Sequence, residues 1–296
     1  MRRSTFRQLQ IFEAIARHMS FTRAAEELFL TQPTVSMQMK KLTDHIGTPQ
    51  FERIGSQLYL TDAGKELLHT CTEIFSELDR YEMMVADLQG LKKGKLRITI
   101  VTTAKYFVPS LLGTFCKRFP GVEASLNVTN REQALIRLEE NLDDLYVLGQ
   151  PPEDLHVESQ PFLDNPLVAL APVDHPLADE KNITLERFSE EPFLVREAGS
   201  GTRKVVKRLF DEHGLELNVR MELGSNEAIK QAVIGGLGVS ILSRHALHHE
   251  PRATKICILD VQGFPILRQW YVVYPVGRQL TIIARTFLEF LHQSEH

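Results

Sequence analysis

The sequence predicts an α/β protein in three parts: a helical head closed by a β-hairpin, one long helix, and a two-lobed α/β body. Its 296 residues exceed the usual size of a single domain. Apolar residues follow helical periodicity through most of the head and the long helix, whereas the body alternates short apolar strands with amphipathic helices, as in a parallel sheet. We place the three parts at 1–61, 62–93 and 94–296, with lobe I at 94–163 and 269–296 and lobe II at 164–268.

Composition and the N-terminal residues are those of a folded protein without a membrane span. Hydrophobic residues make up 43% of the chain and charged residues 24%, which argues against disorder. No apolar run approaches the ~18 residues of a membrane span, and Met1-Arg2-Arg3-Ser4-Thr5 lacks the apolar core of a signal peptide. We therefore expect no membrane partner and a cytoplasmic location. The cysteines Cys71, Cys116 and Cys257 are scattered without a histidine at metal spacing, so we expect no disulfide, metal or other cofactor.

Charge is unevenly distributed along the chain. The net charge is −4, but residues 1–60 carry eight Arg and Lys against five Asp and Glu, and the remainder carries 26 against 33. A basic head on an acidic body suits nucleic-acid contact at one end, although such a small excess is also typical of a solvated surface without a partner.

The head sequence predicts three helices and a hairpin. Apolar residues recur at helical spacing from Phe6, and Ser20-Phe21-Thr22 begins a second short helix. Thr31 can cap a third helix that runs to about Ile46, with Pro33 in its first turn. Its buried stripe is Val35, Met39, Leu42 and Ile46, and its opposite face holds Pro33, Thr34, Met37, Lys40 and Lys41, with Ser36 at the margin.

Two short helices joined by a tight turn, over residues 21–40, fit a helix-turn-helix that reads the major groove of DNA. In that arrangement Gln32 can pair with adenine, Thr34 and Ser36 can meet base edges or phosphates, and Lys40 and Lys41 suit phosphates. Periodicity alone also allows an ordinary helical hairpin with a solvated face. The hairpin expected at 51–60, with Gly55-Ser56 at its turn, favours the DNA reader, because it would place Arg53 beside a minor groove.

The long helix carries a narrow apolar seam. Thr61 can cap it, and seam residues recur at alternating spacings of four and three: Leu67, Cys71, Ile74, Leu78, Tyr81, Val85 and Leu88. This spacing favours pairing with the same helix of a second copy, although burial within one chain is an alternative. Cys71 is interpreted as a packing residue. Gly90 and Gly94 then make a plausible hinge.

The body alternates strands and helices, which predicts parallel sheets in two lobes joined by two crossings, with one cleft between them. We expect strands at 96–101, 122–128, 145–148, 167–171, 193–195, 219–223, 239–242 and 269–274, and helices from 107, at 132–140, at 204–213, from 227 and at 282–291.

Three loops direct polar groups toward that cleft. They contain Thr102, Thr103 and Lys105; Ser200, Gly201, Thr202 and Arg203; and Ser225 and Asn226. Free N–H groups at helix starts bind anions, and these hydroxyls and cations, with Arg131, would add donors. Each loop, taken alone, can equally be a helix cap. The prediction is an anionic ligand.

An enzyme on a two-lobed scaffold is the rival interpretation. No cysteine lies in the three loops and no Gly-x-Ser-x-Gly motif occurs, so we expect no catalytic residues. His245 and His249 have a spacing that could bind metal, with His248 between them, but a solvated polar face is the commoner outcome. A solute-binding protein without DNA activity is a further alternative, against which the head argues.

The head resembles that of LysR-type transcriptional regulators. The similarity rests on Phe21-Thr22-Arg23-Ala24-Ala25-Glu26-Glu27-Leu28, Thr31-Gln32-Pro33-Thr34-Val35-Ser36, Phe51-Glu52-Arg53 and Leu60-Thr61-Asp62-Ala63-Gly64, in order and spacing. The resemblance implies a winged helix-turn-helix in which Gln32, Pro33, Thr34, Ser36 and Lys40 approach bases or phosphates, supported by Arg23 and Arg53. With neighbours on the same face, the DNA-binding set is Arg23, Thr31, Gln32, Pro33, Thr34, Ser36, Met37, Lys40, Lys41 and Arg53.

The body is similar to the branch of this family that regulates RuBisCO operons. The shared segments are Thr102 to Pro109, Asn141 to Leu145, Gly149 to Pro152, Gly199 to Arg203, Glu222 to Lys230 and Trp270 to Pro275, while Tyr146-Val147-Leu148 departs from the expected aliphatic residues. The resemblance implies a periplasmic-binding-protein-like sensor of ribulose bisphosphate, phosphoenolpyruvate or NADPH, with an effector set of Thr102, Thr103, Lys105, Asn130, Arg131, Gln150, Ser200, Gly201, Thr202, Arg203, Ser225 and Asn226.

The same resemblance implies the partners. They are double-stranded promoter DNA, a second copy joined through the linker helix, a further pairing of dimers into tetramers, and RNA polymerase at an activated promoter. Another metabolic operon with a different anionic effector is the alternative within the family.

Overall fold

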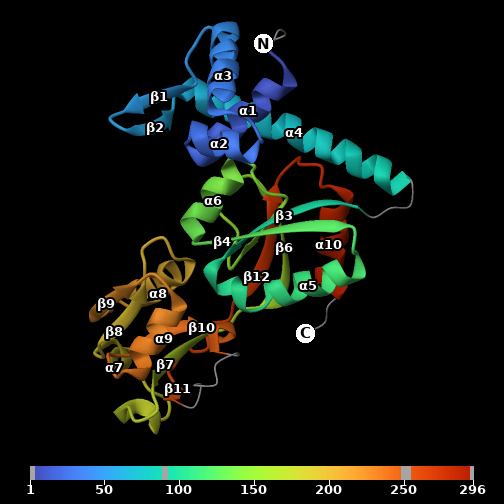
Figure 1. The fold of residues 1–296 in the computed structure, drawn as a ribbon. Coiled ribbons are helices and arrows are strands. Elements are labelled where there is room, and N and C mark those ends of the chain that lie inside the picture. Colours follow the sequence, from blue (N-terminus) through green and yellow to red (C-terminus); the bar gives the residue numbers. More distant parts are fainter. Residues whose placement is uncertain (1–3, 89–92, 248–254, 294–296) are drawn as a thin grey trace. The chain divides into compact units, whose positions relative to one another are not determined.

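The computed structural model describes residues 4–88, 93–247 and 255–293, without the side chains of residues 82–84 and 86–88 (Figure 1). Contacts divide the chain into a head unit that ends at Tyr81 and a body unit that begins at Glu82. The predicted hinge residue Gly90, the seam side chain of Leu88, and His248 and His249 lie outside the described residues. Within the described ranges, no helix is both long and apolar enough to cross a membrane.

The head contains the three helices and the hairpin that the sequence predicts. Thr5 and Ser20 cap the first two helices through their side chains, and Gly47, at φ 84°, ends the third in the left-handed conformation that favours glycine. Thr31 occupies the N-cap position of the third helix, but its hydroxyl pairs with that of Thr34 at 2.9 Å instead of capping. The elements are α1 (Phe6–His18), α2 (Phe21–Glu27), α3 (Gln32–Ile46), β1 (Phe51–Ile54) and β2 (Gln57–Leu60).

Helix α4 (Asp62–Leu88) belongs partly to the head core. The hydroxyl of Thr61 caps it, accepting from the N–H of Gly64 at 3.0 Å as predicted. Leu67 and Cys71 are 6% and 0% exposed, because they pack against the apolar residues of α1, α2 and α3. The alternative of burial within one chain is therefore correct for these two seam residues. Farther along the helix, Leu78 is 43% exposed and Tyr81 is 60% exposed.

Lobe I is a mixed sheet with strand order β4-β3-β5-β12-β6. Strands β4, β3 and β5 run parallel, but β12 is antiparallel to both of its neighbours. The prediction of a wholly parallel sheet is therefore wrong here, because the chain returns from lobe II and inserts its last strand between β5 and β6. The strands are β3 (Gly94–Val101), β4 (Val122–Thr129), β5 (Leu145–Leu148), β6 (Val157–Asp164) and β12 (Gln269–Pro275), and β6 was not predicted.

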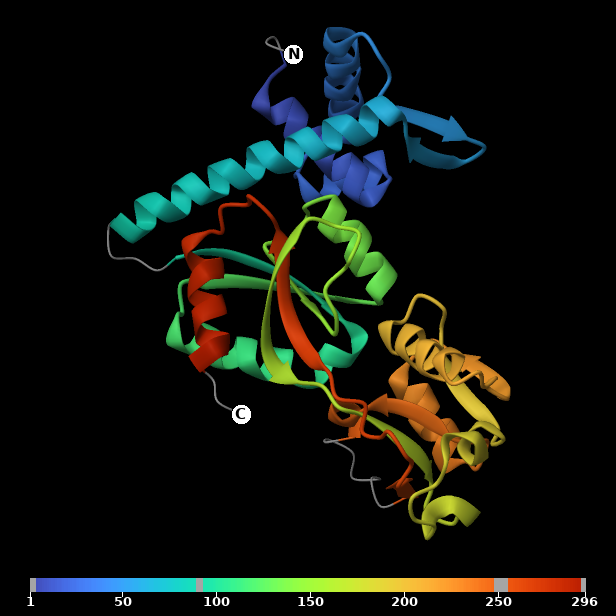
Figure 2. The same cartoon turned by 180° about the vertical axis from the view of Figure 1, so that it is seen from behind.

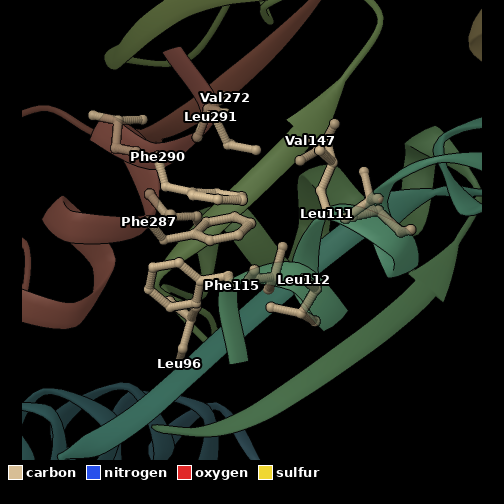
Figure 3. Close-up of a cluster of buried hydrophobic side chains, with 14 of the residues drawn as sticks. Leu96, Leu111, Leu112, Phe115, Val147, Val272, Phe287, Phe290 and Leu291 are labelled. Carbon is tan, nitrogen blue, oxygen red and sulfur yellow. The ribbon is translucent and has the colours of Figure 1, made fainter. Parts of the chain in front are cut away.

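Both faces of this sheet are covered by helices. Helices α5 (Val108–Arg118) and α10 (Ile282–Gln293) cover one face, where Phe115 packs against Phe287 with ring centroids 5.0 Å apart (Figure 3). Helix α6 (Arg131–Glu139) covers the other face. The unexpected Tyr146 points to the α6 side and is fully buried, and its hydroxyl donates to the carbonyl of Arg137 at 2.7 Å. A tyrosine is thus accommodated in a buried strand because its polar atom is paired.

Within its described residues, lobe II folds into two small sheets and three α-helices. Figure 2 shows it on the far side of the crossing segments from lobe I. Strand β7 lies between β10 and β11 and is antiparallel to both, while β8 and β9 are parallel. In this lobe, the prediction of parallel strands is therefore confirmed for β8 and β9 and wrong for β7, β10 and β11. The elements are β7 (Leu167–Pro172), α7 (Leu185–Ser189), β8 (Phe193–Arg196), α8 (Gly201–Glu212), β9 (Val219–Leu223), α9 (Asn226–Ile234), β10 (Ser240–Ser243) and β11 (Ile256–Ile258), of which α7 and β11 were not predicted.

Two segments connect the lobes side by side. The chain leaves lobe I after Asp164 and returns at Gln269, and the N–H of Asn165 donates to the carbonyl of Arg268 at 2.7 Å. This hydrogen bond joins the outgoing and returning segments at the point where the cleft begins.

Candidate functional site

The outward face of α3 carries the residues predicted to contact DNA. Thr31, Gln32, Pro33, Met37, Lys40 and Lys41 are exposed, and Thr34 and Ser36 are half-buried. The amide of Gln32 donates to the hydroxyl of Ser36 at 2.9 Å, so these two groups are held together at the start of the helix.

A groove brings the start of α3 together with the hairpin. Gln32 and Arg53 both line it, although they come from different elements, and Arg23 is exposed on α2 outside the groove. The structure adds groove residues that sequence reasoning missed: Met19, Ser20, Phe21, Thr22, Ser56, Gln57, Leu58 and Tyr59. The hairpin that the sequence predicts after α3 is the signal that could have indicated Gln57 and Tyr59 as residues of this groove.

The body contains a cavity between the lobes, with a volume of about 50 Å³. Three of its lining residues are cations, namely Arg131, Lys204 and Arg268, and none of the described lining residues is Asp or Glu. The other lining residues are Val101, Thr102, Thr103, Gly149, Gln150, Asn165, Leu167, Ser200, Gly201, Thr202, Ser243 and Trp270. The cavity is therefore positive and rich in hydrogen-bond donors.

Seven of the twelve predicted effector residues line this cavity, and five do not. Those that line it are Thr102, Thr103, Arg131, Gln150, Ser200, Gly201 and Thr202. Asn130 and Ser225 serve as side-chain caps of α6 and α9. Arg203 lies instead against a smaller neighbouring cavity, where its Nη1 is buried without a partner among the described residues.

The third predicted loop contacts the other lobe instead of lining the cavity. Glu227 accepts a hydrogen bond from Lys105 Nζ at 2.8 Å and another from the hydroxyl of Tyr106, so Lys105 is occupied. Burial tends to raise the pKa of Glu227, but these two hydrogen bonds prevail and lower it to about 2. Asn226, which is 2% exposed, donates to the hydroxyl of Thr103 at 3.3 Å. The loop therefore faces the other lobe across the cleft, but its side chains join the lobes and do not line the cavity.

Arg196 completes this contact between the lobes. Its side chain is 2% exposed, pairs with Glu197 at 2.7 Å, and donates to Asn226 at 2.5 Å. It also donates to the hydroxyl of Thr102 across the lobes at 3.2 Å. Arg196 and Asn226 thus orient the two threonines that line the cavity.

Arg268 is the cavity residue that sequence reasoning missed most clearly. Its Nη2 donates to the carbonyl of Gly149 and to the side-chain oxygen of Gln150, both at 2.8 Å. Burial lowers its pKa to about 10, and the charges of Arg131 and Arg208 contribute in the same direction. Its only signal in the sequence was its place next to the predicted return strand.

His245 is the one member of the histidine group considered as a metal alternative that the structure describes. His245 lies in a short 3-10 turn, Arg244–Leu247, and its Nε2 is 2.8 Å from the carbonyl of Asp164. No group of three potential metal ligands occurs in the described part of the chain.

Comparison with known proteins identifies both halves of the chain. A family model described as the LysR substrate binding domain matches residues 89–295, and one described as a bacterial regulatory helix-turn-helix protein of the lysR family matches residues 6–65. A transcriptional activator, CmpR, from Synechocystis sp. is 54% identical over 98% of this chain and 96% of its own length. A RuBisCO operon transcriptional regulator from Acidithiobacillus ferrooxidans is 49% identical over 98% of this chain and 94% of its own length.

Solved structures agree with this assignment. The regulatory domain of CcmR from Synechocystis, determined in complex with 2-PG, is 52% identical with a TM-score of 0.65, covering 67% of this chain and 95% of that one. Full-length CbnR in complex with its target DNA shares the fold at 22% identity, with a TM-score of 0.70 over 98% of this chain and all of that one. These relatives are regulators, which sets aside the enzyme interpretation and confirms the resemblance. The chain belongs to the LysR family of bacterial transcriptional regulators.

Proposed function

We propose that this regulator controls an operon of carbon fixation and responds to a small phosphorylated metabolite. The observation that carries the proposal is the cavity between the lobes, which is lined by three cations, several hydroxyls and no carboxylate. A buried anion needs such a set of donors, because leaving its charge unpaired would cost more than the remaining contacts return. The 49% identity to the RuBisCO operon transcriptional regulator of Acidithiobacillus ferrooxidans supports the choice of operon.

A relative solved with a bound ligand narrows the choice of effector. The CcmR domain that was solved with 2-PG has the same fold at 52% identity, which supports 2-phosphoglycolate or phosphoenolpyruvate as the effector of this chain.

In the same proposal the head reads promoter DNA. Helix α3 enters the major groove, where Gln32 meets a base edge and Lys40 and Lys41 meet phosphates. Arg53 lies in the minor groove of the DNA. This placement is supported by the protein surface, where Arg53 and Gln32 line the same hollow of the head. The other proposed contacts are Arg23, Thr31, Pro33, Thr34, Ser36 and Met37.

The functional assembly is a dimer formed through the exposed part of α4, with pairing of dimers into a tetramer and contact with RNA polymerase at the promoter. Leu78 and Tyr81 support the dimer, since large apolar side chains at coiled-coil spacing lie exposed on the single chain.

Calorimetry and gel shifts on the full-length protein test the proposal. We expect 2-phosphoglycolate or phosphoenolpyruvate to bind, and to change the migration or affinity of the complex with DNA from promoters of carbon-fixation genes. If the protein bound those promoters but none of the phosphorylated acids, ribulose bisphosphate or NADPH, the effector assignment would be wrong. If it preferred unrelated promoters, the operon assignment would be wrong.

A further inference from the structure

We propose that the cavity has two anion-binding ends, and that Arg268 is the residue that selects a ligand with two negative groups over a single phosphate. This inference rests on the proposed function, since it concerns the same cavity. It names the class of ligand: a small acid that carries a phosphate and a second anionic group.

The first end is the start of α8. Ser200, Gly201 and Thr202 line the cavity there, and the Ser200 side chain makes no capping hydrogen bond. The first N–H groups of a twelve-residue helix therefore lack a side-chain cap next to the cavity. With the neighbouring hydroxyls, they suit a phosphate group.

The second end is formed by Arg131 and Arg268 on either side of Gln150. Arg131 Nη1 donates to the backbone carbonyl of Gln150 at 2.5 Å, and Arg268 Nη2 donates to its side-chain oxygen at 2.8 Å. The acceptors of these bonds are neutral oxygens. Glu153, whose charge acts on Arg131, is exposed and accepts instead from the amide of Gln150 at 3.2 Å. Two guanidinium groups thus face one cavity without a carboxylate among its lining residues.

Two further groups at this end are unsatisfied. Trp270 and Asn165 both line the same cavity, and Trp270 Nε1 and Asn165 Oδ1 are buried without a hydrogen-bond partner among the described residues. Of these two groups only the Trp270 N–H is a donor and can serve an anion. Asn165 is joined to Arg268 by a backbone hydrogen bond of 2.7 Å. Such unpaired groups are retained where a ligand or ordered water completes them.

The two ends lie close enough for one short ligand. A Cβ built on Gly201 would approach the Cδ of Arg131 to 3.3 Å, so the guanidinium-bearing side chain packs directly on the start of α8. A phosphate at α8 would meet Arg131, which packs there, and would leave the charge of Arg268 without an anionic partner among the described residues of the cavity. A second anionic group between the two arginines would offset that charge.

The test compares 2-phosphoglycolate with inorganic phosphate by calorimetry on full-length wild type, Arg268→Gln and Arg268→Lys. Arg285→Gln is the matched control, since Arg285 is an exposed arginine on α10 outside the cavity. We expect Arg268→Gln to weaken 2-phosphoglycolate at least about tenfold while phosphate changes by less than about twofold, because only the former has a second charge for the guanidinium. Arg268→Lys restores part of the loss, and Arg285→Gln changes neither affinity.

A purely structural role for Arg268 predicts a different pattern of affinities. Arg268→Gln loses the hydrogen bonds to Gly149 and Gln150, so its melting temperature without ligand falls under either role, but a structural defect would weaken both ligands alike. An equal loss of affinity for both ligands would overturn the inference. If wild type bound neither ligand, the proposed function itself would fail.

Discussion

Gln32 begins α3 with its amide exposed on the groove that it shares with Arg53. In this structure the amide donates to Ser36, so contact with a base edge would exchange one hydrogen bond for two. We expect Gln32→Ala to cost about 1–3 kcal/mol of operator binding and to relax discrimination at one base pair. Fluorescence anisotropy with operator and single-substitution duplexes measures both effects. Gln133→Ala, an exposed glutamine on α6, is the control, and equal operator affinity of the two variants would contradict the assignment.

Among single residues, the sequence predicted the hydroxyl-bearing residues of the cavity better than its cations. Because Arg203 follows directly after three cavity-lining residues, the sequence predicts it as a donor to the same cavity. The helical rotation of ~100° per residue instead turns it toward a different cavity beside Phe193 and Val206. Arg268 lies outside the predicted strands and helices, and only the side-by-side crossing of two distant segments brings it to Gln150. Such proximity has no counterpart in local sequence.

Glu227 gives a prediction for the contact between η1 (Thr102–Tyr106) and α9. Its pKa is lowered from 4.5 to about 2, since the hydrogen bonds from Lys105 and Tyr106 outweigh burial. A carboxyl whose folded pKa is depressed stabilises the protein above its unfolded pKa, and that stability is lost as pH falls toward the folded value. The melting temperature of Glu227→Gln should therefore lie below that of wild type at pH 7, with a difference that shrinks between pH 4.5 and about 2. A difference that does not change with pH would contradict the assigned ion pair.

The seam of helix α4 contains residues buried in the head core and residues exposed on the single chain. One substitution of each kind distinguishes their roles. Leu67 is 6% exposed in the head core, so Leu67→Ala should lower head stability by about 2–5 kcal/mol without breaking the assembly. Leu78 is 43% exposed, so Leu78→Asp should leave the monomer folded but desolvate a charge against its symmetry mate. Of the two variants, only Leu78→Asp should sediment as a monomer in a sedimentation-velocity experiment. A wild-type sedimentation coefficient for that variant would place the dimer contact elsewhere.

The apolar seam of α4 predicts which residues form a stripe, but not what covers each of them. Leu67, Cys71 and Leu78 obey the same spacing, yet the first two are buried within their own chain and the third is not. Periodicity reports that a stripe is apolar and does not identify the surface that covers it. The difference arises because the start of α4 packs across α1, α2 and α3, which is a tertiary contact.

For the whole molecule, the kinds and limits of most elements were predictable, whereas strand order was not. Strands such as β5 and β8 appear as short apolar runs in the sequence. Strand β12 has the same appearance, but its antiparallel place between β5 and β6 depends on where the chain re-enters lobe I. Strand β6 was missed because its polar positions alternate irregularly along Val157–Asp164.

The division of the chain into a head unit and a body unit predicts that reading and sensing can be separated by mutation. Thr202 lines the cavity at the start of α8, and Thr202→Val removes its hydroxyl at nearly constant volume. Because a buried phosphate oxygen then loses a donor, we expect affinity for 2-phosphoglycolate to fall by about 1–3 kcal/mol, while affinity for promoter DNA without the metabolite is unchanged. Thr114→Val is the control, since Thr114 is exposed on α5 and its hydroxyl donates to the carbonyl of Ser110. Gel shifts with increasing 2-phosphoglycolate measure both quantities in one experiment.

If Thr202→Val also weakened DNA binding without metabolite, the head and body would be coupled in the absence of effector. If its response to the metabolite equalled that of Thr114→Val, the start of α8 would not be part of the effector site.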